Sequence, residues 1–334
     1  MTAGAQEALV KADHVKVYFK GKNKKSGSVK AVDDVSFEIM RGETFGVVGE
    51  SGCGKSTLGR GILRLIEPTE GKVFYNGRDM STMSDKEMKE LRQKIQIIFQ
   101  DPSACLNPRR TMKQILMEPF RVHGIKDKEF VENRIRELVE LVGLADYHLS
   151  RYPHELSGGQ KQRIGIARAL ALNPELIVCD EAVSALDVSV QAQVINLLDE
   201  LQKKLGLTYV FISHNLNVVH HISDRIGVMY LGKMVEIATA DELYDSQMHP
   251  YTEALLSAIP QVDSHKAKER IILQGEVPSP SNPPKGCCFH TRCPRCMEKC
   301  TEIKPDLVCV GEEHYAACHL TQERVFHFSN SSSN

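Results

Sequence analysis

The stretch "GESGCGKS", Gly49–Ser56, decides the fold because it fits the pattern G-x-x-x-x-G-K-[S/T] at every fixed position. The apolar run before it, Thr44–Val48, predicts a buried strand, and "KSTLGRGILRLI" after it predicts a helix. Glycines let backbone N–H groups turn toward phosphate, Lys55 can reach the β- and γ-phosphates, and the Ser56 hydroxyl can bind Mg²⁺. Strand, loop and helix together indicate a nucleotide-binding α/β fold rather than a chance glycine loop.

Length and composition indicate a large protein with a substantial core. The chain has 334 residues, which suits two domains or one domain with an appendage, and 42% of them are hydrophobic. Its net charge of −1 provides no broad field for nucleic acid or an acidic membrane, so no nucleic-acid partner is expected. No apolar run approaches the ~18–20 residues that span a bilayer, and no signal peptide opens the chain. We therefore expect a chain that folds in the cytosol and meets a membrane only through a partner.

Short, near-continuous apolar runs predict parallel strands covered on both faces. These runs are Ile95–Phe99, Leu176–Cys179, Thr208–Ile212 and Ile226–Tyr230. Between two of them an apolar stripe at helical spacing predicts a core-facing crossover helix. The stripe consists of Val190, Val194, Leu197, Leu198, Leu201 and Leu205. The first forty residues alternate more, as antiparallel strands do.

Two further segments differ from this α/β pattern. Residues 107–149 are mostly helical in pattern, which predicts a helical insertion at about 104–163. The stretch "GEVPSPSNPPKG", Gly275–Gly286, has a linker-like composition, and seven of the ten cysteines follow it. We expect an ATPase-type domain over residues 1–255 and a C-terminal extension with a cysteine cluster over residues 256–334.

Polar residues at predicted strand ends supply the candidate chemistry. Asp180 and Glu181 follow a buried strand, where one carboxylate can hold Mg²⁺ and the other can act as a general base. Gln100 follows another strand and could bridge Mg²⁺ and water, and His214 follows a third and could donate to a γ-phosphate. Asp187, in "SALD", reads as the N-terminal cap of the crossover helix.

A second candidate anion site is "LSGGQ", Leu156–Gln160, just before a helix-forming run. Backbone N–H groups at a helix start and the helix dipole both favour negative charge there. One domain with two phosphate cradles raises the question of whose phosphate the second one binds.

In order and spacing, these motifs resemble those of ABC transporter ATPase subunits over roughly residues 8–260. The resemblance implies an α/β fold: a P-loop NTPase (RecA-like) core with an antiparallel β subdomain and a helical insertion, plus the cysteine-rich C-terminal extension. It also answers the question, because in that family "LSGGQ" binds the ATP held by the opposite subunit of a head-to-tail dimer. Ser157 and Gly159 would therefore act on another chain's nucleotide, and Asp187 would contact the dimer partner.

The resemblance assigns the remaining roles residue by residue. Glu181 is the implied base, His214 the γ-phosphate sensor, and Phe19 the aromatic that stacks on adenine, with Tyr18 next to it. The implied Mg²⁺ ligands are Ser56, Gln100 and Asp180. The implied ATP-binding loop positions are Gly49, Ser51, Gly52, Cys53, Gly54, Lys55, Ser56 and Thr57. The resemblance also implies catalytic roles for Lys55 and Gln100.

Further stretches, such as "QDPSACLNPR" and "HPYTEALLSA", resemble the dipeptide and oligopeptide import branch, which includes nickel importers. The implied function is ATP hydrolysis that powers peptide import, with a nickel or metal-chelate importer as the alternative. The implied partners are a second ABC ATPase subunit (identical or related), two permease subunits and, indirectly, an extracytoplasmic substrate-binding protein. The chain would lie peripherally on the cytoplasmic face of the membrane. Ala182 and Asn215 depart from the branch, which usually has proline and aspartate there, but neither change removes a catalytic group.

Other classes of protein fit less well. An ABC-type ATPase of DNA repair would need a long coiled coil, and a translation-factor ATPase would carry two phosphate loops. A zinc knuckle that binds nucleic acid remains open only for the tail, "CCFHTRCPRCMEKC".

The cysteines of the tail predict a metal centre, because disulfides are uncommon in the cytosol. Spacing alone favours Cys293, Cys296 and Cys300. The resemblance implies a different set of ligands: Cys287, Cys293, Cys300 and Cys318. Thiolate ligands suit a [4Fe–4S] cluster, with Zn²⁺ or no metal as the alternatives.

Overall fold

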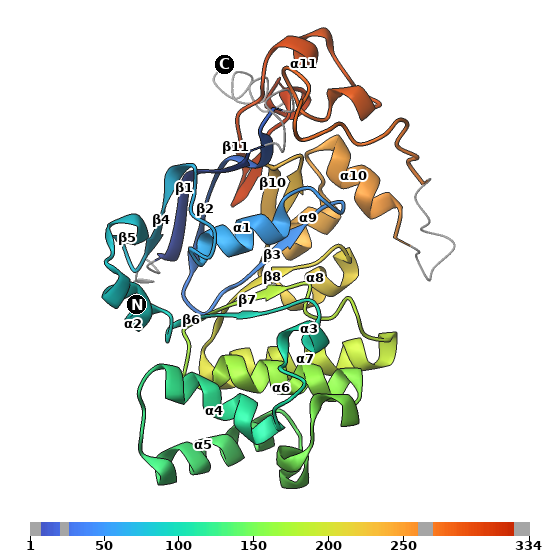
Figure 1. Cartoon of the computed structure of the whole chain (residues 1–334). Coiled ribbons are helices and arrows are strands. Elements are labelled where there is room, and N and C mark those ends of the chain that lie inside the picture. The colour runs from blue at the N-terminus through green and yellow to red at the C-terminus, as the bar shows by residue number, and fades with distance from the viewer. Residues whose placement is uncertain (1–7, 21–26, 260–269, 324–334) are drawn as a thin grey trace, which may run out of the picture. The chain divides into compact units, whose positions relative to one another are not determined.

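The computed structural model describes residues 8–20, 27–259 and 270–323 (Figure 1). These residues form two compact units. Unit 1 consists of Met40–Thr44 and Met80–Ser213. Unit 2 consists of Ala8–Ile39, Phe45–Asp79 and residues 214–323. The chain therefore passes between the units several times, and each unit is assembled from segments far apart in the sequence.

Unit 1 contains three parallel strands and a set of helices. The strands are β6 (Ile95–Ile98), β7 (Leu176–Asp180) and β8 (Thr208–Ile212). The helices are α2 (Asp85–Leu91), α3 (Pro102–Cys105), α4 (Met112–Val122), α5 (Lys128–Leu141), α6 (Gly158–Leu170) and α7 (Val188–Leu205), with short 3-10 turns at Met80–Thr82, Asp146–Ser150 and Pro153–Glu155. β7 pairs in parallel with β6 on one side and β8 on the other. Every residue of β7 and β8 is buried, as their continuous apolar sequences predicted.

Helix α6 is the packing centre of the helical part of unit 1, because α3, α4, α5 and α7 all contact it. The predicted crossover helix is α7, whose buried face is Val194, Ile195, Leu197, Leu198 and Leu201. The first and last residues of the predicted stripe, Val190 and Leu205, are not part of this buried face. Leu205 is 41% exposed near the helix end, and Val190 lies against the backbone of Gly159 instead of in the strand-facing core.

Unit 2 combines an antiparallel subdomain with a second group of strands. The four-stranded sheet has the order β2-β1-β4-β5, with β1 (Ala8–Phe19), β2 (Val29–Met40), β4 (Glu70–Tyr75) and β5 (Arg78–Asp79). The second group runs β11-β12-β10-β9-β3, with β3 (Thr44–Val48), β9 (Arg225–Tyr230), β10 (Lys233–Thr239), β11 (Val308–Gly311) and β12 (His314–Ala316). The antiparallel pairing of β1 with β4 agrees with the alternating pattern of the sequence.

The helices of unit 2 are short. They include α1 (Lys55–Ile62), α8 (Leu216–Ile222), α9 (Ala240–Asp245), α10 (Pro250–Ser257) and α11 (Glu298–Glu302), with a 3-10 turn at His290–Arg292. Their sequences show the expected signals: Asn215 caps α8, and Pro250 opens α10.

The C-terminal residues are integrated into unit 2. Strand β12 pairs with β10, so the extension adds two strands to that sheet. The fully buried ring of Phe289 lies 5.2 Å from Tyr230 and 5.3 Å from Tyr251, measured between ring centroids. The boundary predicted at residue 255 stays a prediction, but residues 270–323 share a core with the rest of unit 2.

A buried hydrogen-bonded cluster of polar groups joins the same elements. Glu236 on β10 accepts hydrogen bonds from the backbone N–H groups of Met248 (2.6 Å) and His249 (3.0 Å), and it pairs with Nε2 of His314 on β12 (2.8 Å). Both side chains of the pair are buried. A buried carboxylate is tolerated because these partners replace its hydration.

Replacing Glu236 with Leu should destabilise the protein strongly, because it leaves two backbone donors and His314 without their acceptor. We expect a loss of about 3–5 kcal/mol in the free energy of unfolding, measured by urea denaturation of the full chain. Asp199→Ala is the control, because it breaks an exposed pair with Lys203 on α7 and should cost less than about 1 kcal/mol. Equal losses in the two variants would contradict a structural role for the buried cluster.

Candidate functional site

The phosphate-binding loop lies between β3 and α1 in unit 2. Gly54 caps α1 with φ 106°, and a Cβ there would lie 1.9 Å from the carbonyl oxygen of Ala31 on β2. Only glycine fits this position, because both the backbone conformation and the neighbouring strand exclude a side chain. The loop thus ends at the N-terminus of helix α1, where N–H groups and the helix dipole attract an anion.

Lys55 is buried and folds back over the loop. Its Nζ donates to the carbonyl oxygens of Gly49 (2.8 Å) and Glu50 (3.0 Å), and it lies 3.8 Å from Sγ of Cys53. Burial raises the pKa of the Cys53 thiol, so this thiol is neutral at pH 7. Nζ of Lys55 is therefore held against the backbone of the loop.

In unit 1 the structure brings together three predicted residues at the ends of two strands. β6 and β7 are parallel, with Ile98 opposite Cys179, so Gln100 and Asp180–Glu181 follow neighbouring strand ends. Nε2 of Gln100 donates to Oε2 of Glu181 over 2.7 Å. Asp180 is buried at the last position of β7. A carboxylate pair with an amide beside it can hold a metal ion and activate a water molecule.

Glu181 has an unusual backbone conformation, with φ 48° in the left-handed region. Its N–H donates to the carbonyl oxygen of Ile212, and its own carbonyl accepts from the Ser184 hydroxyl. Non-glycine residues rarely adopt this conformation, and it is found more often where function fixes a side chain. The strained backbone of Glu181 fits a role in which its carboxylate must point in one fixed direction.

The "LSGGQ" segment begins helix α6. Ser157 is the N-cap, its hydroxyl accepts from the N–H of Gln160 (3.3 Å), and the Gln160 amide oxygen accepts from the N–H of Ser157 (3.0 Å). This capping box fixes an exposed helix start. A Cβ at Gly159 would lie 2.5 Å from Cγ1 of Val190, so α7 can approach only because this residue is glycine.

Asp187 caps the neighbouring helix α7, as predicted. It accepts from the Ser189 hydroxyl (2.7 Å) and from the N–H of Val190 (3.0 Å), and these bonds lower its pKa. Asp187 and Ser157 therefore cap the two adjacent helices α7 and α6, which contact each other.

The remaining predicted residues lie in unit 2. Phe19 ends β1 and is 42% exposed, whereas the hydroxyl of Tyr18 donates to Asp33. An exposed ring is the better candidate to stack on a flat base, which favours Phe19 over Tyr18. His214 is exposed just before α8.

The predicted cysteine ligands gather around one small cavity in unit 2. Cys287, Cys293, Cys300 and Cys318 all line it, together with His290 and His319. Cys296 and Cys309 are exposed, and Cys288 directs its Sγ toward the carbonyl of Tyr230. Burial raises the pKa of Cys287 to about 12 and of Cys293 to about 11. Within the described residues, no group of three or more acidic, His or Cys side chains is arranged to hold a metal ion.

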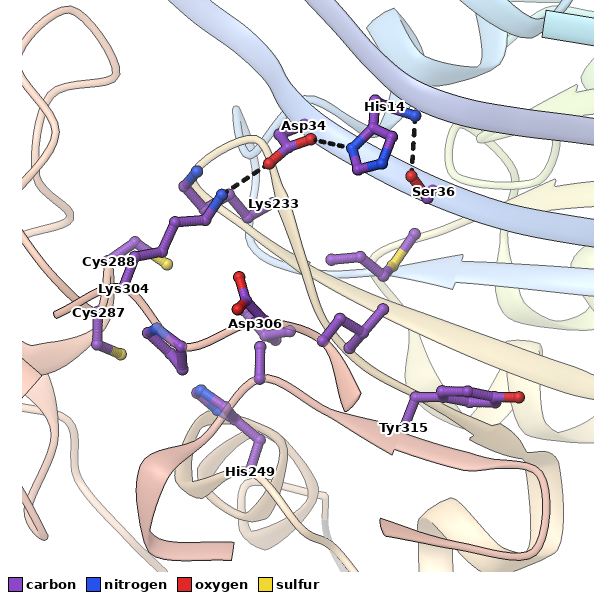
Figure 2. Close-up of a pocket in the computed structure, with 15 residues that line it drawn as sticks. His14, Asp34, Ser36, Lys233, His249, Cys287, Cys288, Lys304, Asp306 and Tyr315 are labelled. Atoms are coloured by element: carbon purple, nitrogen blue, oxygen red, sulfur yellow. Dashed lines mark hydrogen bonds and ion pairs between the residues drawn. The ribbon is translucent and has the colours of Figure 1, made fainter. Parts of the chain in front are cut away.

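A larger cavity of about 380 Å³ lies between the four-stranded sheet and the C-terminal residues (Figure 2). Asp34 accepts hydrogen bonds from His14 (2.7 Å) and Lys304 (2.9 Å), which lower its pKa to about 2. Lys233 pairs with Asp33 (2.6 Å). Lys233 and Lys304, the two lysines that line this cavity, are therefore each paired with an aspartate.

Sequence reasoning missed two residues beside the phosphate loop. The hydroxyl of Tyr251 accepts from the N–H of Glu50 (2.9 Å), and Arg292 pairs with the Glu50 carboxylate. Neither belongs to a nucleotide-binding motif, and Arg292 lies 242 positions from Glu50. Tyr251 lies in the stretch "HPYTEALLSA" and Arg292 lies next to Cys293, but neither position connects its residue to the loop.

The loop, the strand-end carboxylates and the capped glycine motif define the chain as a P-loop ATPase of the ATP-binding cassette class. Two family models agree: one described as "ABC transporter" matches residues 32–184, and one described as "Oligopeptide/dipeptide transporter, C-terminal region" matches residues 235–300.

Known proteins place the chain within this class. It is 54% identical to the oligopeptide transport ATP-binding protein AppF of Bacillus subtilis (strain 168) over 96% of this chain and 99% of that protein. It is 49% identical to the oligopeptide transport ATP-binding protein OppF of Haemophilus influenzae over 94% and 97% of the two chains. The dimeric ABC transporter cassette MJ0796 superposes with a TM-score of 0.63 at 30% identity, covering 70% of this chain and 99% of that one. The chain belongs to the family of oligopeptide-transporter ATP-binding proteins and is an ABC-type ATPase.

No helix in the part of the chain that the structure describes is both long enough and apolar enough to cross a membrane.

Proposed function

We propose that this protein hydrolyses ATP to power the import of oligopeptides or dipeptides through a membrane permease. The observation that carries the proposal is the 54% identity, continuous over 96% of the chain, to an oligopeptide transport ATP-binding protein. The match of residues 235–300 to a C-terminal region of oligopeptide and dipeptide transporters favours peptide over the nickel alternative.

In the proposed site the chemical tasks are divided among named residues. The loop N–H groups, Lys55 and Thr57 bind phosphate, and Phe19 stacks on adenine. Ser56, Gln100 and Asp180 would hold Mg²⁺, which prefers oxygen ligands and would neutralise charge on the phosphates. The donor set fits, because Gln100 uses Nε2 toward Glu181 and so keeps its amide oxygen for a cation.

Glu181 is the proposed general base. Its carboxylate takes a proton from water while the water oxygen attacks the γ-phosphorus, and ADP leaves with the electron pair of the broken P–O bond. The hydrogen bond from Gln100 and the fixed backbone at φ 48° keep the carboxylate in one direction. His214 is proposed to donate a hydrogen bond to the γ-phosphate.

Replacing Glu181 with Gln should keep ATP binding but lower the rate of hydrolysis at least ~100-fold, because the amide cannot accept the proton. The measurement is phosphate release together with nucleotide affinity of the full chain. Glu175→Gln is the matched control, since Glu175 directly precedes the same strand β7 at its other end and pairs with Arg41. Hydrolysis by Glu181→Gln at the rate of the control would refute the assignment.

The "LSGGQ" segment is proposed to act on the nucleotide of a second subunit. Ser157 caps an exposed helix start, which suits an anion presented from outside the chain. Dimers of related cassettes support this arrangement. Each composite site would then use the loop of one chain and Ser157, Gly159 and Asp187 of its partner, whether identical or related.

Ser157→Arg chains should bind MgATP within about threefold of wild type but should not hydrolyse it, whereas Lys55→Ala chains should bind poorly because they lose the loop's cation. Mixing the two should restore part of the hydrolysis, because one composite site keeps both intact halves. Ser150→Arg adds the same charge to another exposed serine and should remain active. A loss of affinity in Ser157→Arg as large as in Lys55→Ala would show that Ser157 acts within its own chain.

The helical part of unit 1 is proposed to dock on the permease. α4 and α5 border a hollow of about 820 Å³ that includes the exposed side chain of Met117, a surface suited to a partner helix. ATP-driven movement of this insertion, predicted at about residues 104–163, would be transmitted to two permease subunits. The chain would thus be held peripherally at the cytoplasmic face, and an extracytoplasmic binding protein would deliver the peptide.

The cysteine cavity is proposed to hold a [4Fe–4S] cluster, with Zn²⁺ as the alternative. The fit rests on the donor set: Cys287, Cys293, Cys300 and Cys318 line one cavity, while Cys296 and Cys309 are exposed. Such a centre would be structural and would tie the extension together, because ATP hydrolysis requires no electrons.

Anaerobically purified protein should be brown and contain about four irons per chain. Changing Cys287, Cys293, Cys300 or Cys318 to Ser should abolish iron binding, whereas Cys296→Ser should retain it because that thiol is exposed outside the cavity. The measurement is metal content by mass spectrometry. One zinc per chain in colourless protein would contradict the cluster, and loss of metal in Cys296→Ser would contradict the ligand set.

A further inference from the structure

An arginine of the C-terminal extension reaches the phosphate-binding loop. Nη1 of Arg292 lies 2.8 Å from Oε2 of Glu50, and Nη2 lies 3.2 Å from Oε1. Glu50 is the second residue of the "GESGCGKS" loop. The two parallel bonds form a bidentate pair, the strongest arrangement of an arginine with a carboxylate.

The arginine is held in place by its surroundings. Its side chain is only 8% exposed, and its guanidinium lies 6.0 Å from the centroid of the Tyr230 ring. Phe289, three residues earlier, is anchored in the buried aromatic cluster with Tyr230 and Tyr251. Its bonds to Glu50 raise the pKa of Arg292 above its usual value. This pair therefore differs from a mobile surface ion pair, whose contribution is small.

Glu50 is also fixed through its backbone. Its N–H donates to the Tyr251 hydroxyl (2.9 Å), and its carbonyl accepts from Nζ of Lys55 (3.0 Å). The carboxylate, the N–H and the carbonyl of this one residue thus each have a partner in unit 2, and one partner is the lysine that faces phosphate. The conformation of Glu50 is coupled to the centre of the nucleotide site.

A carboxylate in this loop opposes the loop's task. The loop binds a polyphosphate through N–H groups and one ammonium, and a fixed negative charge a few residues away repels the same ligand. Arg292 supplies the compensating charge from outside every nucleotide-binding motif. A guanidinium suits this role because it stays charged and binds both carboxylate oxygens.

We propose that Arg292 is a positioning residue of the nucleotide site, which supports MgATP binding by cancelling the charge of Glu50 in the phosphate loop. The proposal rests on the proposed nucleotide site at Gly49–Thr57. It makes the C-terminal extension a functional part of that site.

The test is calorimetric titration of MgATP into the full chain and its variants. Arg292→Ala should bind about tenfold more weakly, since an uncompensated carboxylate then faces the phosphates. Glu50→Gln, which removes the charge but keeps the shape, should stay within about threefold of wild type. The double variant Arg292→Ala/Glu50→Gln should recover to within about threefold, because no charge remains to be cancelled. Arg292→Lys keeps the positive charge but cannot form the bidentate pair, so its affinity for MgATP should lie between those of Arg292→Ala and wild type.

Arg295→Ala is the matched control. Arg295 is in the same extension, three residues from Arg292, and pairs with Glu253 on α10 rather than with the loop. It should bind MgATP like wild type. Lys55→Ala tests the nucleotide site itself and should bind poorly. If Lys55→Ala binds normally, the proposed site fails.

Three outcomes would overturn the inference while leaving the nucleotide site intact. They are an Arg292→Ala affinity within twofold of wild type, an equal loss in Arg295→Ala, and a double variant as weak as Arg292→Ala. If Arg292→Ala does not fold, Arg292→Lys and Glu50→Gln decide: Arg292→Lys must bind more weakly than wild type while Glu50→Gln does not, and any other result overturns the inference.

Discussion

The phosphate-binding loop has to present backbone N–H groups to an anion, and this requirement shapes unit 2. Such a loop needs left-handed backbone at Gly54, and the carbonyl of Ala31 approaches so closely that no Cβ could be present. β2 therefore packs directly on the loop, the all-buried β3 fixes its start, and α1 provides the helix dipole at its end. The three elements β3, β2 and α1 are each necessary, because together they direct the N–H groups of the loop toward one anion.

The residues proposed for catalysis are divided between two compact units. The loop with Lys55 belongs to unit 2, whereas Gln100, Asp180 and Glu181 belong to unit 1. Strand β3 connects them, because Thr44 is in unit 1 and Phe45 begins the next segment of unit 2. The hydrogen bond between Gln100 and Glu181 orients the proposed base within its own unit. An ATPase whose conformation changes during its cycle can couple chemistry to movement.

Much of the fold could be predicted from the sequence because its signals are local. The buried strands are continuous apolar runs. Ser157 and Asp187 are residue types that cap helices, and each accepts a hydrogen bond from the N–H three residues later. The extension could not be predicted in the same way. Strand β11 is apolar but largely exposed, and β12 has only three residues, so neither shows the pattern of a buried strand. The pairs Glu236–His314 and Glu50–Arg292 join residues 78 and 242 positions apart, and a sequence pattern contains no signal for them.

These long-range contacts make the C-terminal extension a structural part of unit 2. A tail held only by its own cysteines would leave the ATPase unaffected, but this one places Phe289 in the core and a guanidinium on the phosphate loop. A buried arginine is stable only when its partner carboxylate is in place, so the extension and the loop each favour the ordered form of the other. Linkage then requires reciprocity. If the docked extension favours the loop conformation that binds nucleotide, bound nucleotide must favour the docked extension to the same degree.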